Sequence, residues 1–172
     1  QRASELCCEP SQPVLAQAFL GLARIHYQWN DLDAAQEYGK QCYILLQQME
    51  DTDTTASYNI FLAYIYLSQN DFTKAYDILD DAVAFVHRND FMFRMPTIAE
   101  AQVRILIHRG DLETASQLAE AYDLPISQAH VYLAQNNATK ALEILALFLQ
   151  DISESTHQSD LLKALIIQAL VC

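Results

Sequence analysis

Apolar residues recur at helical spacing on both sides of a short polar motif that appears four times in this chain. The copies begin at Asn30, Asn70, Gly110 and Asn136, and the first three start 40 residues apart. Apolar or small residues lie four and eight positions before the second residue of each copy, and seven and eleven positions after it. Such offsets place side chains on one face of an α-helix. The pattern therefore predicts pairs of helices joined by a tight turn.

Each position of the motif has a physical reason. The first residue is Asn or Gly, which tolerate the left-handed conformation that ends a helix. The second is Asp or Asn, whose side-chain oxygen caps the next helix by accepting a backbone N–H. Four residues later comes an alanine, which is small enough for the partner helix to approach closely. These alanines are Ala35, Ala75, Ala115 and Ala141.

The motif predicts an all-α fold of about four helix–turn–helix repeats and part of a further helix. The repeats are expected at about 12–49, 55–87, 97–122 and 126–152, with the further helix at 160–172. They resemble tetratricopeptide (TPR) repeats, in which a small residue before the turn and an alanine after it occupy matching positions. The tryptophan position of the first helix holds Phe19, Asn59 and Ala99 instead, and 40 residues exceeds the ~34 of a regular TPR, so the copies are divergent. The resemblance implies a TPR-like α-α superhelix, and we expect residues 1–172 to form one domain.

Composition supports a helical protein without a membrane span. Hydrophobic residues make up 52% of the chain, which supplies a core, and glycine (3) and proline (4) are scarce. No stretch of about 18 uncharged apolar residues appears, so we expect no membrane contact. The chain lacks an initiator Met and a signal peptide pattern, residues 3–8 resemble the tail of a preceding helix, and the last residues continue an apolar helical pattern. We therefore expect a fragment of a longer protein.

The net charge bears on which partners the chain can bind, and the cysteine content bears on its cellular compartment. The net charge is −12 and the pI is about 4.6, which disfavours direct contact with nucleic acid. Cys7, Cys8, Cys42 and Cys172 form neither a disulfide framework nor a Cys-x-x-Cys pair. The adjacent Cys7–Cys8 pair is either redox-active or, as we favour, buried in a helix. These features predict a reducing, cytoplasmic setting.

Two connections between repeats have alternative interpretations. The acidic stretch 50–54 contains a DxD-like triplet that can bind a cation, but it lacks the other oxygen ligands of a calcium loop, so a solvated loop is favoured. The link 91–96 is apolar and aromatic with one arginine. It is either a ligand or partner contact, or, as we favour, a segment that packs over the neighbouring repeat.

The sequence holds no recognisable catalytic or cofactor motif. A P-loop, a His-Glu-x-x-His zinc motif and a Gly-x-Ser-x-Gly elbow are all absent, and the five histidines fall in different predicted helices or loops. His26 takes the position filled elsewhere by Tyr66, Leu106 and Tyr132, so we expect it to pack between helices. We predict that this chain is not an enzyme and binds neither a metal nor a cofactor itself.

One column of residues suggests a binding surface. In a TPR-like superhelix the first helix of each pair lines the concave face, and this column lies seven residues before each cap. It reads Arg24, Tyr64, Arg104 and His130, and nearby candidates are Gln17, Tyr27, Gln28, Glu100 and His108. Basic and aromatic groups in an acidic protein suit a small polar or carboxylate-bearing ligand, or an acidic peptide. Alternatively, the arginines pair with neighbouring acids such as Glu100.

Several sequence segments resemble a known protein family, both in their order along the chain and in the unequal spacing between them. The order is clearest in the second half of the chain, where AHVYLAQN (129–136) and KALEIL (140–145) are followed by a loop and DLLKALIIQAL (160–170). Upstream, LGLARIHYQWNDLDAA (20–35) and AQVRILIHRGDL (101–112) also fit. Together these segments resemble the helical-repeat domain of the large MalT-like transcription activators of the LuxR class.

That resemblance implies a role in gene regulation. Such proteins carry an N-terminal P-loop ATPase module, a winged helix, this superhelix and a C-terminal DNA-binding helix-turn-helix, so ATP is expected in a module outside this chain. The superhelix would sense a small inducer or a regulatory protein and promote self-association. The alternative is a TPR adaptor that holds a peptide of a protein partner, without a transcriptional role.

Overall fold

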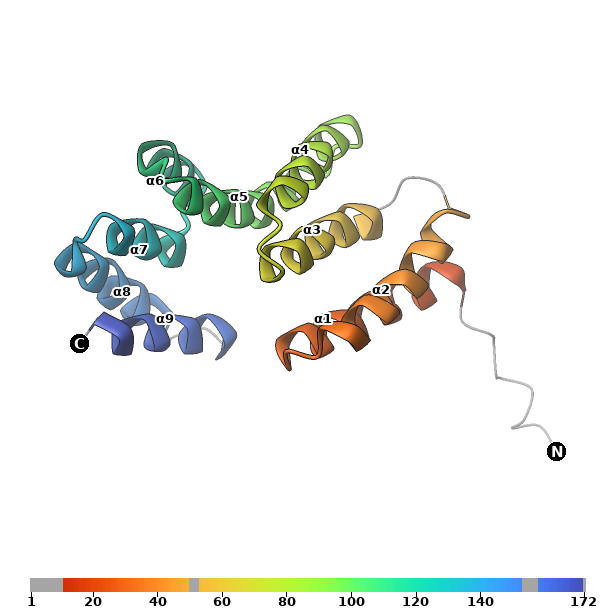
Figure 1. Ribbon diagram of the computed structural model, residues 1–172, viewed down its shortest axis with the longest axis horizontal. Helices are drawn as coiled ribbons and strands as arrows, with labels where there is room; N and C mark the ends of the chain where they lie inside the picture. The colour runs from red at the N-terminus through yellow and green to blue at the C-terminus, as the bar shows by residue number, and fades with distance from the viewer. Residues whose placement is uncertain (1–10, 50–52, 153–157, 172) are drawn as a thin grey trace. The chain divides into compact units, whose positions relative to one another are not determined.

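The computed structural model describes residues 11–49, 53–152 and 158–171, and all regular secondary structure in these residues is helical (Figure 1). The elements are α1 (Gln12–Gln28), α2 (Leu32–Leu46), α3 (Asp53–Ser68), α4 (Phe72–Arg88), the 3-10 helix η1 (Met92–Arg94), α5 (Met95–Arg109), α6 (Leu112–Ala121), α7 (Pro125–Ala134), α8 (Ala138–Ile152) and α9 (Gln158–Val171). The predicted all-α, TPR-like fold is confirmed. Outside the described residues lie the predicted helix tail at 3–8, Cys7, Cys8, Cys172, and the parts of the predicted loops at 50–52 and 153–157.

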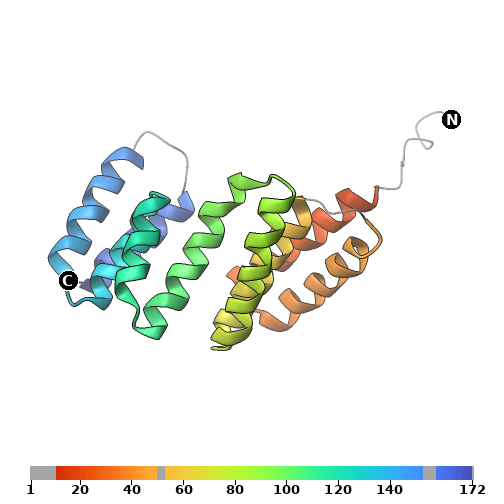
Figure 2. The same cartoon turned by 90° about the horizontal axis from the view of Figure 1, so that it is seen from above.

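The repeated motif builds the same turn four times. Asn30, Asn70 and Asn136 have φ angles of 61°, 59° and 58°, and Gly110 has 79°, so all four adopt the predicted left-handed conformation. The next residue then caps the following helix: the side chains of Asp31, Asp71, Asp111 and Asn137 each accept a hydrogen bond at 3.2 Å from the backbone N–H three residues on. Because the geometry is common to all copies, each pair of helices leaves its turn in a similar way, and the two helices lie side by side (Figure 2).

Small side chains set the distance between paired helices. The alanines after the turn, Ala35, Ala75, Ala115 and Ala141, have no exposed surface, and neither do the small residues before it, Ala23, Ala63, Val103 and Ala129. A larger side chain at these positions would push the helices apart, since a close-packed core tolerates added volume poorly.

The chain divides into two compact units, Gln1–Arg94 and Met95–Cys172. The expectation of one domain over 1–172 stays a prediction. In the first unit, α1 packs on α2, α3 packs on α4, and α3 also contacts α1 and α2. A core cluster joins Leu20 of α1, Cys42 of α2 and Phe61 of α3. His26 stacks on Tyr38 with ring centroids 5.2 Å apart, which confirms that this histidine packs between helices.

The second unit contains α5 to α9. Val103 of α5, Ala115 of α6 and Val131 of α7 form one buried cluster, and Leu145 of α8 and Ile167 of α9 belong to another. The Gln128 side chain also donates to the main-chain carbonyl of Ala119 at 3.2 Å, which ties α7 to α6. Helix α7 contacts both α5 and α9. The candidate site lies among these three helices.

The link between the two middle repeats is shorter than predicted. The sequence predicts a connection at 91–96, whereas α5 already begins at Met95. Pro96 lies in the first turn of α5, where its missing N–H breaks no helical bond. Phe91 packs on Phe85 of α4 with ring centroids 6.2 Å apart, as the packing alternative requires, while Phe93 remains 64% exposed.

Candidate functional site

A groove in the second unit collects three of the predicted binding residues. It has a volume of about 460 Å³ and opens between α5, α7 and α9. We call it the α5–α7 groove, and it is lined by Glu100, Val103, Arg104, Ile107, Ile126, Ser127, His130, Ile166 and Ile167. Its volume falls within the ~300–1,000 Å³ range of small-molecule sites.

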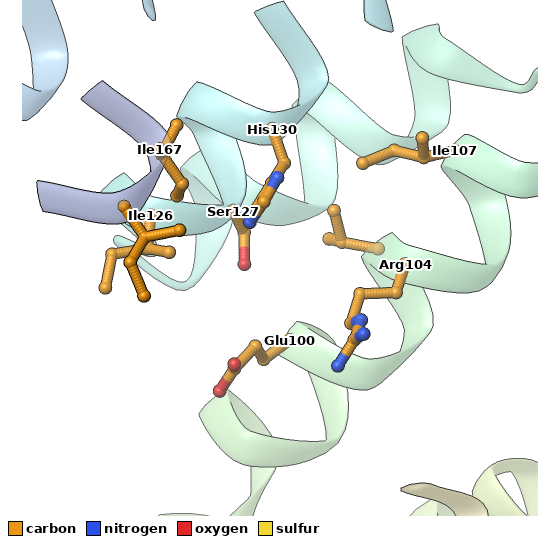
Figure 3. A pocket seen from close by; sticks show the side chains of 9 residues that line it. Glu100, Arg104, Ile107, Ile126, Ser127, His130 and Ile167 are labelled. Carbon is orange, nitrogen blue, oxygen red and sulfur yellow. The ribbon is translucent and has the colours of Figure 1, made fainter. Parts of the chain in front are cut away.

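Helical spacing explains why the polar side chains share this groove. Glu100 and Arg104 are one turn apart on α5, and Ser127 and His130 are one turn apart on α7, so each pair lies on one face of its helix. Figure 3 shows the Arg104 and Glu100 side chains extending from α5 into the space that the Ser127 hydroxyl and the His130 ring face from α7. The polar groups therefore converge from two helices that are not neighbours in sequence.

Apolar residues form the rest of the wall. Val103 and Ile167 are buried, Ile107 and Ile126 are half-buried, and Ile166 of α9 is 52% exposed. A ligand in the groove would thus bury apolar surface against isoleucines while its polar groups reach α5 and α7. This combination of an apolar wall and a few convergent polar groups is typical of small-molecule sites.

The polar side chains of the groove offer both hydrogen-bond donors and acceptors. Desolvation by the surrounding side chains, and then the positive charge of Arg104, lower the pKa of His130 below its ordinary value of 6.5. This shift favours the neutral form of His130, which offers one ring N–H donor and one acceptor nitrogen. Arg104 supplies charged donors in a fixed fork, Ser127 a hydroxyl and Glu100 an acceptor, so the groove can hold a ligand with a carboxylate beside hydroxyl groups.

The remaining predicted residues lie elsewhere. His108, near the C-terminal end of α5, is exposed and does not line the groove. In the first unit, Tyr27 and Tyr64 bring their rings to 6.4 Å between centroids, and Gln28 is exposed. Arg24 lines a separate, smaller groove in that unit.

Sequence reasoning missed Ser127 and the apolar wall. Ser127 precedes His130 by one helical turn, so the spacing along the predicted helix was a usable signal. Ile166 and Ile167 had no comparable signal, because they enter the groove from α9, and only the packing of α9 against α7 brings them there.

The residues that the structure describes contain no candidate metal site. Among residues 11–49, 53–152 and 158–171, no three His, Cys, Asp or Glu side chains are grouped so that they could hold a metal ion. Within the same ranges, no helix is both long and apolar enough to cross a membrane.

The repeated capped turns, the buried alanines and the polar groove define a TPR-like helical-repeat protein with a candidate ligand site. The family model of the MalT-like TPR region matches residues 1–172, and the chain belongs to this family. Neither the curated proteins nor the solved structures include a match to it.

Proposed function

We propose that this chain is the effector-sensing region of a bacterial LuxR-class transcription activator. A small inducer, or alternatively a regulatory protein, binds it and promotes self-association and transcription activation. One observation carries this proposal: a chain of the MalT-like TPR family has a groove in which Arg104, His130 and Ser127 converge beside an isoleucine wall. The chain acts by binding and not by catalysis, and the activator works in the cytoplasm with ATP bound by a module outside this chain.

The geometry of the groove supports a small ligand. The polar side chains come from α5 and α7 and part of the apolar wall from α9, so a molecule that fills the groove touches three helices. An inducer with one carboxylate and an apolar body would pair its charge with Arg104 and cover Ile126 and Ile166.

Binding across three helices provides a mechanism for signalling. A ligand favours whichever arrangement of α5, α7 and α9 lets it contact all three, and it shifts the population toward that arrangement by its difference in affinity. We propose that this arrangement is the one competent for self-association.

The test is a thermal-shift screen of the purified chain against a library of small metabolites, followed by calorimetry on each hit. Arg104→Ala should weaken binding of a true inducer by about tenfold or more, because a hydrogen bond to a charged group contributes about 1.5–3 kcal/mol. The matched control is Arg109→Ala, which removes the same charge from an exposed position on the same helix, outside the groove. Equal affinity of the wild type and Arg104→Ala, with circular dichroism unchanged, would refute the site.

A second experiment tests the transcriptional role independently. Sequencing the gene on both sides of the region that encodes this chain should reveal a P-loop module upstream and a LuxR-type helix-turn-helix downstream. If both are absent and the chain captures extended peptides in preference to metabolites, it is a TPR adaptor instead.

A further inference from the structure

A second groove, in the first unit, gathers positive charge in an otherwise acidic protein. It lies where α1 meets the start of α3 and has a volume of about 190 Å³. We call it the Arg24 groove; the side chains that matter for its chemistry are those of Gln17, Arg24, Asp53, Thr54, Ser57 and Arg94. The effector site proposed above plays no part in this inference.

Arg94 is held in place by a two-point ion pair. Its Nε donates to Oδ1 of Asp53 at 2.7 Å, and Nη2 donates to Oδ2 of the same carboxylate. Asp53 is the first residue of α3, and Arg94 ends η1. The guanidinium is therefore fixed at the edge of the groove, since a bidentate pair restrains both position and orientation.

Arg24 is placed differently. It projects from α1, and its Nη2 donates to the main-chain carbonyl of Ser57 in α3 at 3.3 Å. Among the residues that the structure describes, no carboxylate lies within 4.0 Å of its guanidinium. Desolvation and then the charge of Arg94 lower the pKa of Arg24, which means that its surroundings disfavour the positive charge that it carries.

The charges of the described side chains in this groove do not balance. Two guanidinium groups face one carboxylate, which leaves one positive charge in a protein whose net charge is −12. We propose that the Arg24 groove binds an oxyanion, the phosphate or carboxylate group of a small molecule, between Arg24 and Arg94. The anion accepts charge-assisted hydrogen bonds from Arg24 and offsets the repulsion between the two guanidinium groups.

The size and lining of the groove define the class of ligand. A volume of about 190 Å³ is below the ~300 Å³ at which drug-sized sites begin, so the groove holds a charged group and not a whole molecule. Thr54 and Ser57 are buried polar residues in its wall, and Gln17 adds an amide. The rest of the ligand would extend outward from this anchor, past Gly21, where an added Cβ meets no atom within 4 Å.

The test is an NMR titration of the purified chain with inorganic phosphate and, separately, with acetate, at constant ionic strength set with sodium chloride. The Nε–Hε signals of Arg24 and Arg94 report the site directly. We expect saturable shifts of both signals with at least one anion, and the anion that binds more tightly identifies the phosphate or carboxylate class. Arg24→Gln should weaken this binding about tenfold, because it removes a charged donor. Arg88→Gln, which removes the same charge from an exposed position on α4, should not.

A second pair of variants keeps both arginines and changes only the charge beside them. Gly21→Glu places a competing carboxylate in the open space of the groove, whereas Gly21→Gln places a neutral side chain of the same size there. Binding should be lost in Gly21→Glu and largely kept in Gly21→Gln. The proposal is overturned if neither anion shifts the two arginine signals, if Arg24→Gln and Arg88→Gln have equal effects, or if the two Gly21 variants bind alike.

Discussion

Two glycines in neighbouring helices should respond oppositely to the same substitution. Gly21 lies inside α1, and a Cβ built there meets no atom within 4 Å. Glycine in a helix interior is less favourable than alanine by about 0.8–1.0 kcal/mol. Gly21→Ala should therefore stabilise the first unit by about that amount, because the new methyl group costs nothing in packing.

Gly39 lies inside α2 at a close approach to α3. A Cβ there would sit 3.1 Å from Cε1 of Phe61, below the 3.5–4.0 Å at which two carbons attract best. Phe61 is 4% exposed and meets the ring of Tyr27 edge-on at 6.3 Å between centroids, so it has little room to move. Overpacking a core costs about 1–3 kcal/mol. After the gain of about 1 kcal/mol in helix propensity, Gly39→Ala should be neutral or destabilising by up to about 2 kcal/mol.

Urea unfolding followed by tryptophan fluorescence is the assay. Trp29, the single tryptophan of the chain, lies at the end of α1 with its ring 5.5 Å from that of His26, so its emission reports the first unit. A change of 1 kcal/mol moves the midpoint by roughly 0.3–1 M urea. The midpoint should rise in Gly21→Ala and stay or fall in Gly39→Ala. If the urea midpoint rises equally in both variants, the contact between α2 and α3 is looser than in the structure. That result would refute the predicted overpacking at Gly39.

Two further predictions follow from ionisable groups. In an NMR titration, His130 should show a pKa below 6.5, and this pKa should rise in Arg104→Gln. Because the folded state favours the neutral ring, the contribution of His130 to the free energy of unfolding is complete above pH 6.5. It is lost as the pH falls through the lowered pKa. A pKa of 6.5 or higher in the wild type would contradict this. Burial raises the pKa of the Cys42 thiol from 9.0 to about 11, so in a variant with serine at positions 7, 8 and 172 it should resist iodoacetamide at pH 8 until urea unfolds the chain. Rapid labelling of the folded variant would show that Cys42 is accessible.

The sequence was most informative where a local rule decides the structure. The turns at Asn30 and Gly110 followed from residues that tolerate positive φ, and the cap at Asp111 followed from one side-chain oxygen. These features depend on residues adjacent in the chain, so pattern alone predicts them.

Features that depend on residues far apart in the chain were harder to predict from the sequence. Helix α3 is buried around most of its circumference, with Ala56, Tyr58, Ile60 and Phe61 all under 9% exposed. The spacing of apolar residues predicted this helix but not that more than one of its faces is buried. The pair between Asp53 and Arg94 joins residues 41 positions apart. Arg104 and His130 of the predicted column line one groove, and their role in binding stays a prediction. Ile166 and Ile167 reach that groove only through the packing of α9 against α7.

The invariant turn also determines where the chain can be rearranged. Inside every pair, the left-handed residue is followed directly by the cap residue and then by the second helix, so an insertion there would break the cap and separate the buried alanines. Differences in repeat length are instead absorbed by helix length and by the joins between pairs: α6 and α7 have only 10 residues each, and the fourth copy of the motif starts 26 residues after the third. A whole pair is thus the natural unit of recombination. Chimaeras cut at the joins between pairs, such as 122–124, should keep every turn and cap intact. Because Val103, Ala115 and Val131 form one cluster across this join and the α5–α7 groove also spans it, core packing and ligand preference should depend on both of the joined pairs.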